Sequence, residues 1–328
     1  MIARFYEIIK LVISGALLPM VLFAQGSDAE FVSVEGFQKV AQAGYQFLKI
    51  SVGTRAPGMG DAATTISGDA DNVFWNPAGI AAIDGNAIFF GYTAWFADIK
   101  HMAFSTTWDA GKLGVFGLNA VGMDYGTIEG TIINGQNNIG YDDIGNIAPI
   151  EYAVGISYAR GFTDKFSLGG TAKYCAQDLV EKSSNVIAFD FGTLYNTGWK
   201  DLTIGMSLQH FAKKIRYVEE YFNLPMMFRI GIGADILKLL NIESDIHQAT
   251  IIVEGANPLD YSERVHLGLE YWYHNIMAIR AGYKFNYDNE DFTFGATLRL
   301  TDIDVGFAHS NFGSILGQVN RFSIHYNF

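Results

Sequence analysis

The chain has 328 residues, of which 17% are charged and 14% are aromatic, and its formal net charge at pH 7 is −12. This composition excludes a disordered chain, because such chains are polar and poor in aromatic residues. A single cysteine excludes a disulfide scaffold. The acidic balance argues against nucleic-acid binding, which needs a basic surface.

The first segment is predicted to be a targeting signal rather than part of the fold. Arg4 and Lys10 give a basic start, and the apolar run 11–23 is followed by Ala24 and then by polar residues. This order is typical of a Sec signal peptide, and the run is short for a transmembrane helix. An uncleaved N-terminal anchor is the alternative. We therefore expect a signal peptide at 1–24 and export of the mature protein.

The rest of the chain is dominated by segments in which apolar and polar residues alternate. In 277–287, for example, Ile279, Ala281 and Tyr283 alternate with Arg280, Gly282 and Lys284. A period of two indicates a strand with two different faces. The segments have about the ten residues that a tilted membrane strand needs, and aromatic residues gather at their ends, as in the interfacial girdles of outer-membrane barrels.

The alternation predicts an all-β fold, a 14-stranded antiparallel transmembrane β-barrel over residues 85–328. The strands are expected near 86–97, 99–109, 111–125, 149–161, 164–178, 183–196, 200–211, 224–237, 247–256, 261–273, 276–287, 290–301, 303–310 and 318–328. The third and ninth segments alternate poorly, which leaves a bulge or a miscount open in each. If the chain ends on the periplasmic side, the long connections 126–148, 212–223 and 309–317 are extracellular, and 238–246 is a long periplasmic exception.

Residues 25–84 precede the strands and have a different composition. A short helix is expected within 37–50, and the runs 52–62 and 69–80 are rich in Gly, Ala and Asp. Asn76 before Pro77 favours a turn. Such a segment packs closely against another surface, and inside a barrel it would form a hatch or plug.

Two stretches of the sequence resemble a known family. The run FLKISVGTRAPGMGDAATTISGDADNVFWNPAGIA at 47–81 and the run GLEYWYHNIMAIRAGYKF at 268–285 are similar to the PorV/PorQ family of type IX secretion, within the FadL-like barrel superfamily. The resemblance implies an outer-membrane shuttle that binds the C-terminal signal domain of secreted cargo and passes it to surface attachment machinery. The implied partners are cargo proteins, translocon and attachment-complex proteins and outer-membrane lipid. A PorQ-like role or that of another paralogue stays open.

Two other functions also stay open. In a FadL-like channel for hydrophobic small molecules, the hatch around Asn76-Pro77-Ala78 would shape an apolar pocket, acyl lipid or detergent would occupy the lumen, and a gap in the wall would release the substrate sideways. A porin-like barrel would have no specific ligand. The shuttle predicts a protein partner at the rim and a blocked lumen, whereas the porin predicts ion conductance.

Charged residues on the predicted lumen face suggest either ion pairs that pack a plugged lumen or a site for a ligand headgroup. The hairpin of 261–273 and 276–287 places Glu270 opposite or diagonal to Arg280, and Arg55 is a candidate third member. The candidate lumen and hatch residues are Arg55, Gly58, Met59, Gly60, Trp75, Asn76, Pro77, Ala78, Gly79, Arg264, Glu270, Arg280, Lys284 and Arg299. Cys175 is expected to be a small packed residue on this face.

Acidic residues outnumber basic ones in the predicted extracellular loops, with Asp288, Glu290 and Asp291 among them. These loops are either simply solvated or form an acidic rim for a basic partner or divalent cations. The loop residues predicted to bind a partner are Tyr125, Glu129, Asp142, Asp143, Tyr217, Glu219, Glu220, Tyr221 and Phe222.

Enzyme motifs do not occur in the sequence. It has no Gly-x-Ser-x-Gly elbow, no Cys-x-x-Cys pair and no Walker loop. Asp190-Phe191-Gly192 spells a kinase tripeptide but stands in an alternating segment without companion motifs, so we interpret it as coincidence. The sequence predicts no enzymatic activity, no cofactor and no metal site.

Overall fold

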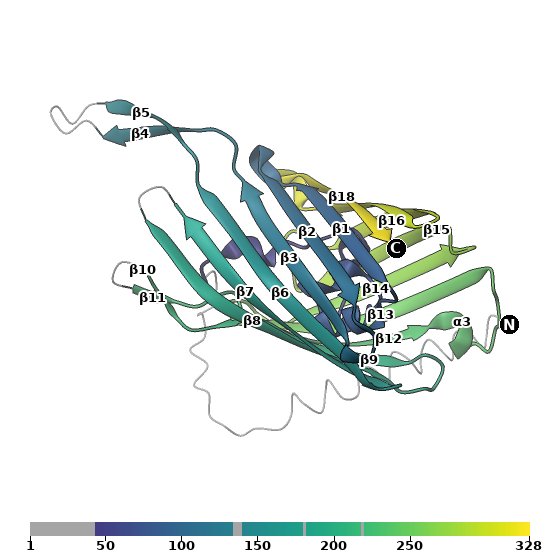
Figure 1. Ribbon diagram of the computed structural model, residues 1–328. Helices are drawn as coiled ribbons and strands as arrows, with labels where there is room; N and C mark the ends of the chain where they lie inside the picture. Colours follow the sequence, from purple (N-terminus) through teal and green to yellow (C-terminus); the bar gives the residue numbers. More distant parts are fainter. Residues whose placement is uncertain (1–42, 134–139, 180–181, 218–219) are drawn as a thin grey trace, which may run out of the picture. The chain divides into compact units, whose positions relative to one another are not determined.

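The computed structural model describes residues 43–133, 140–179, 182–217 and 220–328, all within one unit of the chain, 39–328. Fourteen antiparallel strands close into a barrel, which confirms the predicted fold class (Figure 1). The predicted signal peptide at 1–24 and residues 25–42 lie outside the described residues. The barrel strands are β1 (Asn86–Ala94), β2 (Lys100–Asp109), β3 (Val115–Asp124), β6 (Ile150–Thr163), β7 (Phe166–Asp178), β8 (Ser183–Asn196), β9 (Thr203–Ala212), β12 (Met227–Asp235), β13 (His247–Pro258), β14 (Arg264–Tyr273), β15 (Met277–Phe285), β16 (Phe292–Leu300), β17 (Ile303–Asn311) and β18 (Gln318–Asn327).

The strands pair in a regular register, and β1 closes the barrel against β18. The third and ninth segments contain no bulge and no miscounted strand, since β3 and β13 pair with both neighbours without a shift. The shifts lie instead between Gly161 and Thr163 of β6 and between Phe189 and Phe191 of β8. In the β8–β9 pair the extra residue lies in β9, where Gln209 and His210 stand opposite Asp190. Both are buried, so the alternation of β9 changes phase at this point.

The wall has an apolar outer face. Large hydrophobic side chains point outward along the strands and are about half exposed, among them Phe104, Ile156, Phe191, Ile279 and Ile324. The alternate residues of the same strands are buried, as the period of two predicts. A closed barrel with an apolar exterior satisfies its backbone internally and suits a bilayer, so the wall is that of an outer-membrane barrel.

In the part of the chain that the structure describes, no helix is long and apolar enough to cross a membrane.

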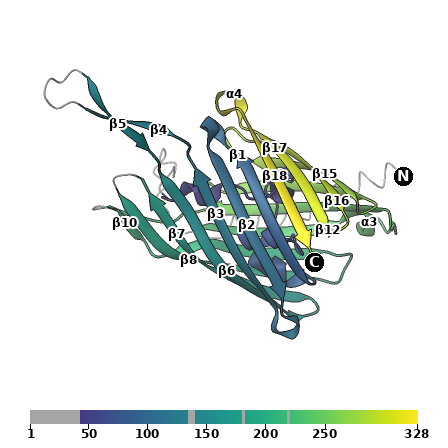
Figure 2. The same cartoon turned by 45° about the horizontal axis from the view of Figure 1, so that its top comes forward.

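The two ends of the barrel differ in their connections. One end, the long-loop end, carries the connection from β3 to β6 and that from β9 to β12, each with its own two-stranded hairpin. The first hairpin is β4 (Ile128–Ile133) with β5 (Tyr141–Ile147), and it projects beyond the neighbouring strands (Figures 1 and 2). The second is β10 (Ile215–Tyr217) with β11 (Glu220–Phe222). A small helix, α4 (Gly313–Leu316), lies between β17 and β18.

The other end, the short-turn end, has tight connections and receives the C-terminus. Its helical pieces are η5 (Gly111–Leu113) and α3 (Ile236–Leu239), and α3 overlaps only the first two residues of the long connection predicted at 238–246. Asp235 caps α3 by accepting hydrogen bonds from the backbone N–H groups of Leu237 and Lys238.

Residues 43–84, which we call the inner segment, lie inside the barrel (Figure 1). Their helical pieces are short: η1 (Gln46–Lys49), α2 (Arg55–Gly58), η2 (Ala70–Phe74) and η3 (Pro77–Ala82). A further one, η4 (Phe96–Asp98), joins β1 to β2. The short helix expected within 37–50 is therefore a single 3-10 turn in the described part of that range. Consecutive pieces contact different sides of the wall, with α2 against β15 to β17 and η3 against β6 to β8.

Glycine allows the closest contacts between the inner segment and the wall. A Cβ added at Gly282 of β15 would collide with the backbone of Met59 and Gly60. Gly60 itself has φ +66°, a left-handed conformation that glycine adopts at little cost. The backbone N–H of Gly60 then donates to Thr293 Oγ1 at 2.9 Å. Small residues in 52–62 therefore bring two backbones together.

Candidate functional site

The first contact between the inner segment and the wall is a buried ion cluster around Glu270. Glu270 lies directly across from Arg280 in the β14–β15 register, as the hairpin predicts, and accepts from Arg280 Nε at 2.6 Å. Arg55 joins from the inner segment, with Nη2 2.6 Å from Glu270 Oε1 and Nη1 2.7 Å from Asp69 Oδ2. Burial alone would lower the pKa of Arg55, but the two carboxylates raise it above its ordinary value. The cluster ties the inner segment to the wall.

A second ion cluster lies toward the long-loop end. Lys284 Nζ is 2.5 Å from Asp61 Oδ2 and 2.7 Å from Glu290 Oε1. Burial opposes the ionised form of Asp61, but Lys284 outweighs it and holds the pKa of Asp61 below its ordinary value. Glu290 is only 6% exposed, so the expectation that it is a solvated loop residue is wrong. The neighbouring lysine draws it inward.

A third cluster is centred on Glu254 of β13, which is fully buried. Arg229 Nη1 lies 2.7 Å from Glu254 Oε1, and His266 Nδ1 lies 3.3 Å from the same oxygen. The other carboxylate oxygen accepts the backbone N–H of Ala63 at 2.9 Å and that of Thr64 at 2.8 Å. The wall thus holds the inner segment through its backbone as well as through its side chains.

The turn at Asn76 contacts the opposite side of the wall. Asn76 Nδ2 donates to Thr64 O at 2.7 Å and to Thr193 O of β8 at 3.1 Å, and Asn76 Oδ1 accepts from Ala78 N at 3.1 Å. Trp75 Nε1 donates to Val52 O at 3.1 Å. Most of the predicted hatch residues are buried here or at α2, namely Gly58, Met59, Gly60, Trp75, Pro77, Ala78 and Gly79. They pack with one another and with the wall, and their assignment as ligand residues stays a prediction.

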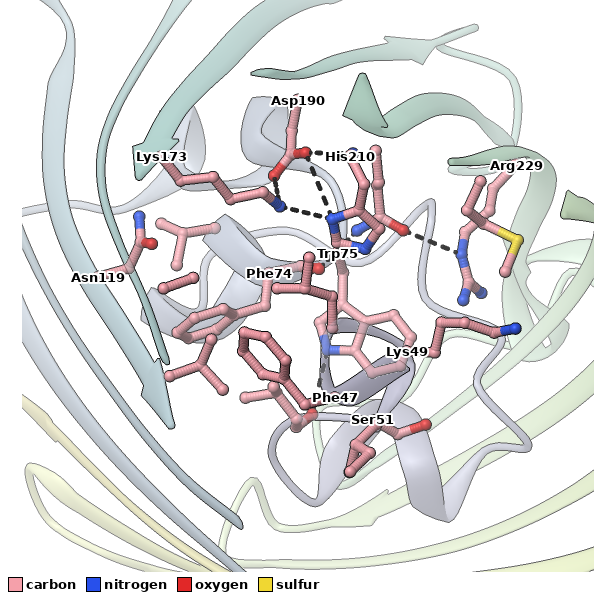
Figure 3. A pocket seen from close by; sticks show the side chains of 18 residues that line it. Phe47, Lys49, Ser51, Phe74, Trp75, Asn119, Lys173, Asp190, His210 and Arg229 are labelled. Carbon is pink, nitrogen blue, oxygen red and sulfur yellow. Dashed lines mark hydrogen bonds and ion pairs between the residues drawn. The ribbon is translucent and has the colours of Figure 1, made fainter. Parts of the chain in front are cut away.

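A small cavity of about 50 Å³ remains between the inner segment and the wall (Figure 3). Phe47, Phe74 and Trp75 supply its apolar side. On its polar side Lys173 Nζ lies 2.7 Å from Asp190 Oδ2 and 2.7 Å from His210 Nδ1. A dry cavity that holds benzene has roughly 150 Å³, so this one is too small for an aromatic ring unless the inner segment moves.

A much larger cavity opens at the long-loop end above the inner segment. We call it the vestibule, and its volume is about 680 Å³. Its floor includes residues of the inner segment such as Lys49 and Asp61, and its rim carries aromatic and apolar side chains. Lys49 Nζ pairs with Asp260 Oδ2 at 2.9 Å. Ligand pockets have about 300–1,000 Å³, so the vestibule is large enough for a small molecule.

Two predicted lumen residues lie outside the ion clusters. Arg264 lines the vestibule, and its guanidinium carbon stands 4.0 Å from the ring centroid of Tyr287 and 4.9 Å from that of Tyr261. Arg299 is half-buried and pairs with Asp304 of β17, with Nη2 2.6 Å from Oδ2. The structure therefore brings Arg55, Glu270 and Arg280 together and keeps these two apart from them.

The predicted loop residues are spread over three places. Glu129 and Asp143 are exposed on the β4–β5 hairpin, as is Asp142. Tyr125 donates from its hydroxyl to Glu151 and lines the vestibule. Tyr221 is 63% exposed, whereas Phe222 packs against Tyr45 of the inner segment with ring centroids 6.2 Å apart. Tyr217 and Glu220 belong to β10 and β11, and Glu219 lies outside the described residues.

The outer wall has a shallow hollow of about 440 Å³ over β3, β6, β7 and β8. Its lining is almost wholly apolar and includes Phe116, Ile156 and Phe189. The described strands pair continuously around the barrel, so the side exit expected for a channel is not open in this conformation. The register shift between β8 and β9 at 189–191 is the irregularity next to the hollow.

Sequence reasoning missed several buried polar residues of the lumen. Asp190 was set aside as part of a chance tripeptide, yet it contacts Lys173 and accepts from the backbone N–H of His210 at 2.6 Å. Arg229 and Glu254 were also missed. The available signal was the strand alternation itself, which assigns these positions to the same face as Glu270 and Arg280.

A search of models of known protein families finds no match, and a search of curated proteins finds none either. Solved structures are similar in fold. CymD, a monoaromatic hydrocarbon channel, aligns with a TM-score of 0.56 and 14% identity over 85% of this chain and 98% of that chain. The toluene transporter TodX of Pseudomonas putida aligns with a TM-score of 0.53 and 12% identity over 88% and 98%.

A FadL homologue from Pseudomonas aeruginosa gives a TM-score of 0.54 and 12% identity over 85% of this chain and 99% of that chain. At these identities the likeness shows the fold alone. The chain therefore has the fold of FadL-type outer-membrane barrels.

Proposed function

We propose that this protein is a FadL-like outer-membrane channel that takes up hydrophobic small molecules through the vestibule. The observation that carries the proposal is the 680 Å³ vestibule at the long-loop end of a FadL-type barrel, closed below by the inner segment. The similar solved structures are described as channels or transporters for toluene and monoaromatic hydrocarbons. Residues 1–24 serve as the signal peptide, residues 25–84 as the hatch and residues 85–328 as the barrel in this proposal.

Passage through the barrel requires the inner segment to move. The cavity beneath the vestibule has only about 50 Å³, so a ring or an acyl chain must displace Phe47 and its neighbours to pass. The apolar side of this cavity, Phe47, Phe74 and Trp75, supports a route for a hydrophobic ligand. Binding in the vestibule is thus the first step, and release of the inner segment is the second.

The proposal is tested by ligand binding to the purified full-length protein in detergent. We expect toluene or a fluorescent fatty acid to bind at one site per chain, and a bulky substitution in the vestibule, Ile99→Trp, to weaken binding. Leu113→Trp, at an exposed position of the short-turn end, is the matched control and should have no effect. Absence of saturable binding by the native protein would contradict the channel.

A shuttle for secreted proteins is the second candidate, and the β4–β5 hairpin favours it. Ile132, Ile133 and Tyr141 are between 56% and 80% exposed on this hairpin, beside the acidic residues Glu129 and Asp143. Exposed apolar residues beside charges are typical of a protein-binding surface. The PorV/PorQ resemblance adds that the partner would be a cargo signal domain, with translocon and attachment proteins as further partners.

The two candidate functions predict that different molecules co-purify with the protein from native membranes. Mild-detergent purification followed by mass spectrometry of proteins and lipids separates them. Stoichiometric acyl lipid without a protein partner supports the channel. Enrichment of secreted proteins with a shared C-terminal domain supports the shuttle and overturns the channel as the main role.

A further inference from the structure

The hollow in the outer wall is a gap in a row of aromatic side chains. The residues that stand opposite one another at this level of β2, β3, β6, β7 and β8 are Trp108, Phe116, Tyr158, Gly170 and Phe191. All of them lie on the outer face of their strands, and only the glycine places no side chain there. A Cβ added at Gly170 would meet ordinary contacts, the nearest being Asp190 O at 3.4 Å. The space above Gly170 is therefore open.

The next level toward the long-loop end has the same form. Ala172 of β7 stands between Ile156 of β6 and Phe189 of β8. Large side chains return to the outer face of β7 at Tyr174 on one side and at Leu168 on the other. The hollow of about 440 Å³ thus follows β7, with small residues as its floor and with aromatic and aliphatic side chains as its walls.

The length of the hollow matches one leaflet of a bilayer. From Leu168 to Tyr174 an extended strand advances by about 20 Å. At a strand tilt of about 45° this covers roughly 14 Å along the membrane normal, which is about half of the ~30 Å hydrocarbon core. Leu168 lies two residues after the start of β7 at the short-turn end, which is the periplasmic end in the predicted orientation. The hollow therefore faces the acyl chains of the leaflet on that side.

Two cations stand where the hollow reaches the short-turn end. Arg160 of β6 is exposed on the outer face and stands opposite Leu168. Lys112 is exposed on η5, and this turn is held against the hollow by the hydroxyl of Tyr158, which donates to Leu113 O at 2.6 Å. Neither Arg160 nor Lys112 forms an ion pair among the described residues. Both are therefore available to an anion at the membrane surface.

The turns around these cations are basic in an acidic chain. Together they carry Lys112, Arg160 and Lys165 against Asp109 and Asp164, whereas the whole chain has a net charge of −12. Asp109 Oδ1 accepts from the backbone N–H of Gly111 at 2.8 Å, which keeps this carboxylate within its own turn. Lysine and arginine near a membrane surface are attracted to anionic lipid headgroups. The charge at this end of the hollow thus complements an anionic headgroup.

We propose that the hollow and the cations at its end bind one anionic phospholipid of the leaflet at the short-turn end. One acyl chain lies along β7 over Gly170 and Ala172, and the phosphate contacts Arg160 and Lys112. A phospholipid fits because its apolar length and its anionic end follow one another along the membrane normal in the same order as the hollow and the cations. The inference concerns the outer face of the barrel and does not rest on passage of small molecules through the lumen.

The test is native mass spectrometry of the full-length protein in mild detergent, titrated with dioleoyl phosphatidylglycerol or with dioleoyl phosphatidylcholine. The two lipids have the same acyl chains and differ in net charge. We expect one phosphatidylglycerol to bind per chain with saturation, about tenfold more tightly than phosphatidylcholine, because each nearby cation attracts the anionic headgroup. Equal affinities for the two lipids, or binding of many lipids without saturation, would overturn the site without the need for any variant.

A substitution that fills the hollow locates the acyl chain. Gly170→Leu places an apolar side chain over the floor and is expected to weaken phosphatidylglycerol about tenfold. Gly122→Leu is the matched control, since Gly122 is an outward glycine of β3 outside the hollow, where an added Cβ meets nothing closer than 3.5 Å. This control should bind like the native protein. Native affinity in Gly170→Leu would overturn the assignment of the acyl chain to the hollow.

A second set of variants locates the headgroup. Arg160→Gln combined with Lys112→Gln is expected to bind the two lipids with equal affinity and to leave phosphatidylcholine unchanged. Lys100→Gln, which removes an exposed cation of β2 at the long-loop end, is the control and should keep the tenfold preference. A preference that persists in the double variant would overturn the headgroup contact. If light scattering finds a native dimer that Gly170→Leu dissociates, the hollow is an interface between two copies and the lipid assignment is overturned.

Discussion

Neutralising Glu270 should loosen the inner segment from the barrel wall. The Glu270 carboxylate accepts three hydrogen bonds, from Arg55 Nε at 3.0 Å, Arg55 Nη2 at 2.6 Å and Arg280 Nε at 2.6 Å. Glu270→Gln keeps the shape of the side chain and removes the charge. It leaves the buried guanidinium of Arg280 and the partly exposed one of Arg55 with one fewer anion between them, and Asp69 remains as the partner of Arg55.

The expected loss in the free energy of unfolding is about 3–5 kcal/mol, the cost of removing one partner of a buried ion pair. For a chain of this size that corresponds to a fall of roughly 5–8 °C in the melting midpoint. Intrinsic fluorescence during a thermal ramp in detergent measures it. Glu129→Gln, which removes an exposed carboxylate from β4, is the matched control and should shift the midpoint by less than about 1 °C.

A double-mutant cycle of Glu270→Gln with Arg55→Met isolates the link between wall and inner segment. We expect a coupling energy of about 2 kcal/mol, since the two residues share one hydrogen-bonded cluster. If Glu270→Gln has the same melting midpoint as the control variant, or if the effects of the two substitutions are additive, this ion cluster does not fasten the inner segment to the wall.

Three further predictions concern packing, protonation and the rim. Gly282→Ala places a Cβ against the backbone of Gly60 and should destabilise the protein by about 1–3 kcal/mol, whereas Gly170→Ala meets only ordinary contacts and should not; equal melting midpoints would contradict this. Burial raises the pKa of Asp71 to about 6, so the native state keeps a proton that the unfolded chain has lost, and stability falls as the pH rises through 6. Asp71→Asn should therefore remove the fall in melting midpoint between about pH 4 and 6, and at pH 7 its free energy of unfolding should exceed that of the native protein by about 2 kcal/mol; an unchanged pH profile would count against it. Ile133→Asp, at a position 80% exposed on the β4–β5 hairpin, should leave melting unchanged but remove any protein partner from native purifications, and retention of that partner would exclude the hairpin as its docking surface.

The strands could be predicted closely from the sequence because the polarity of each side chain indicates which face of the strand it lies on. β8 begins and ends where the alternation places it, at Ser183 and Asn196, and the other boundaries differ by a few residues at turns. The pairing of Glu270 with Arg280 also followed, since a tight hairpin sets the register of its two strands. The local sequence pattern was therefore sufficient to predict contacts between residues of adjacent strands.

Contacts between distant parts of the chain could not be predicted in the same way. Glu290 stands in a connection rich in acids, and nothing local distinguishes it from its exposed neighbours; its burial depends on Lys284 and on Asp61 of the inner segment. The bulge in β9 likewise depends on a distant contact, since it places His210, whose φ is +60°, beside Asp190 of β8. The path of residues 43–84 depends on contacts with many strands at once, which no period in the sequence encodes.

The inner segment packs against the lumen face of the wall, and the accessibility of the single cysteine measures how closely. Cys175 faces the lumen from β7, is fully buried, and belongs to the apolar cluster that includes Tyr45 and Phe47 of the inner segment. The measurement is the rate of maleimide labelling of the native protein in membranes, compared with the protein unfolded by heat in SDS. We expect labelling only after unfolding. Rapid labelling of the folded protein would mean that water reaches Cys175 through an open lumen, and would contradict the account.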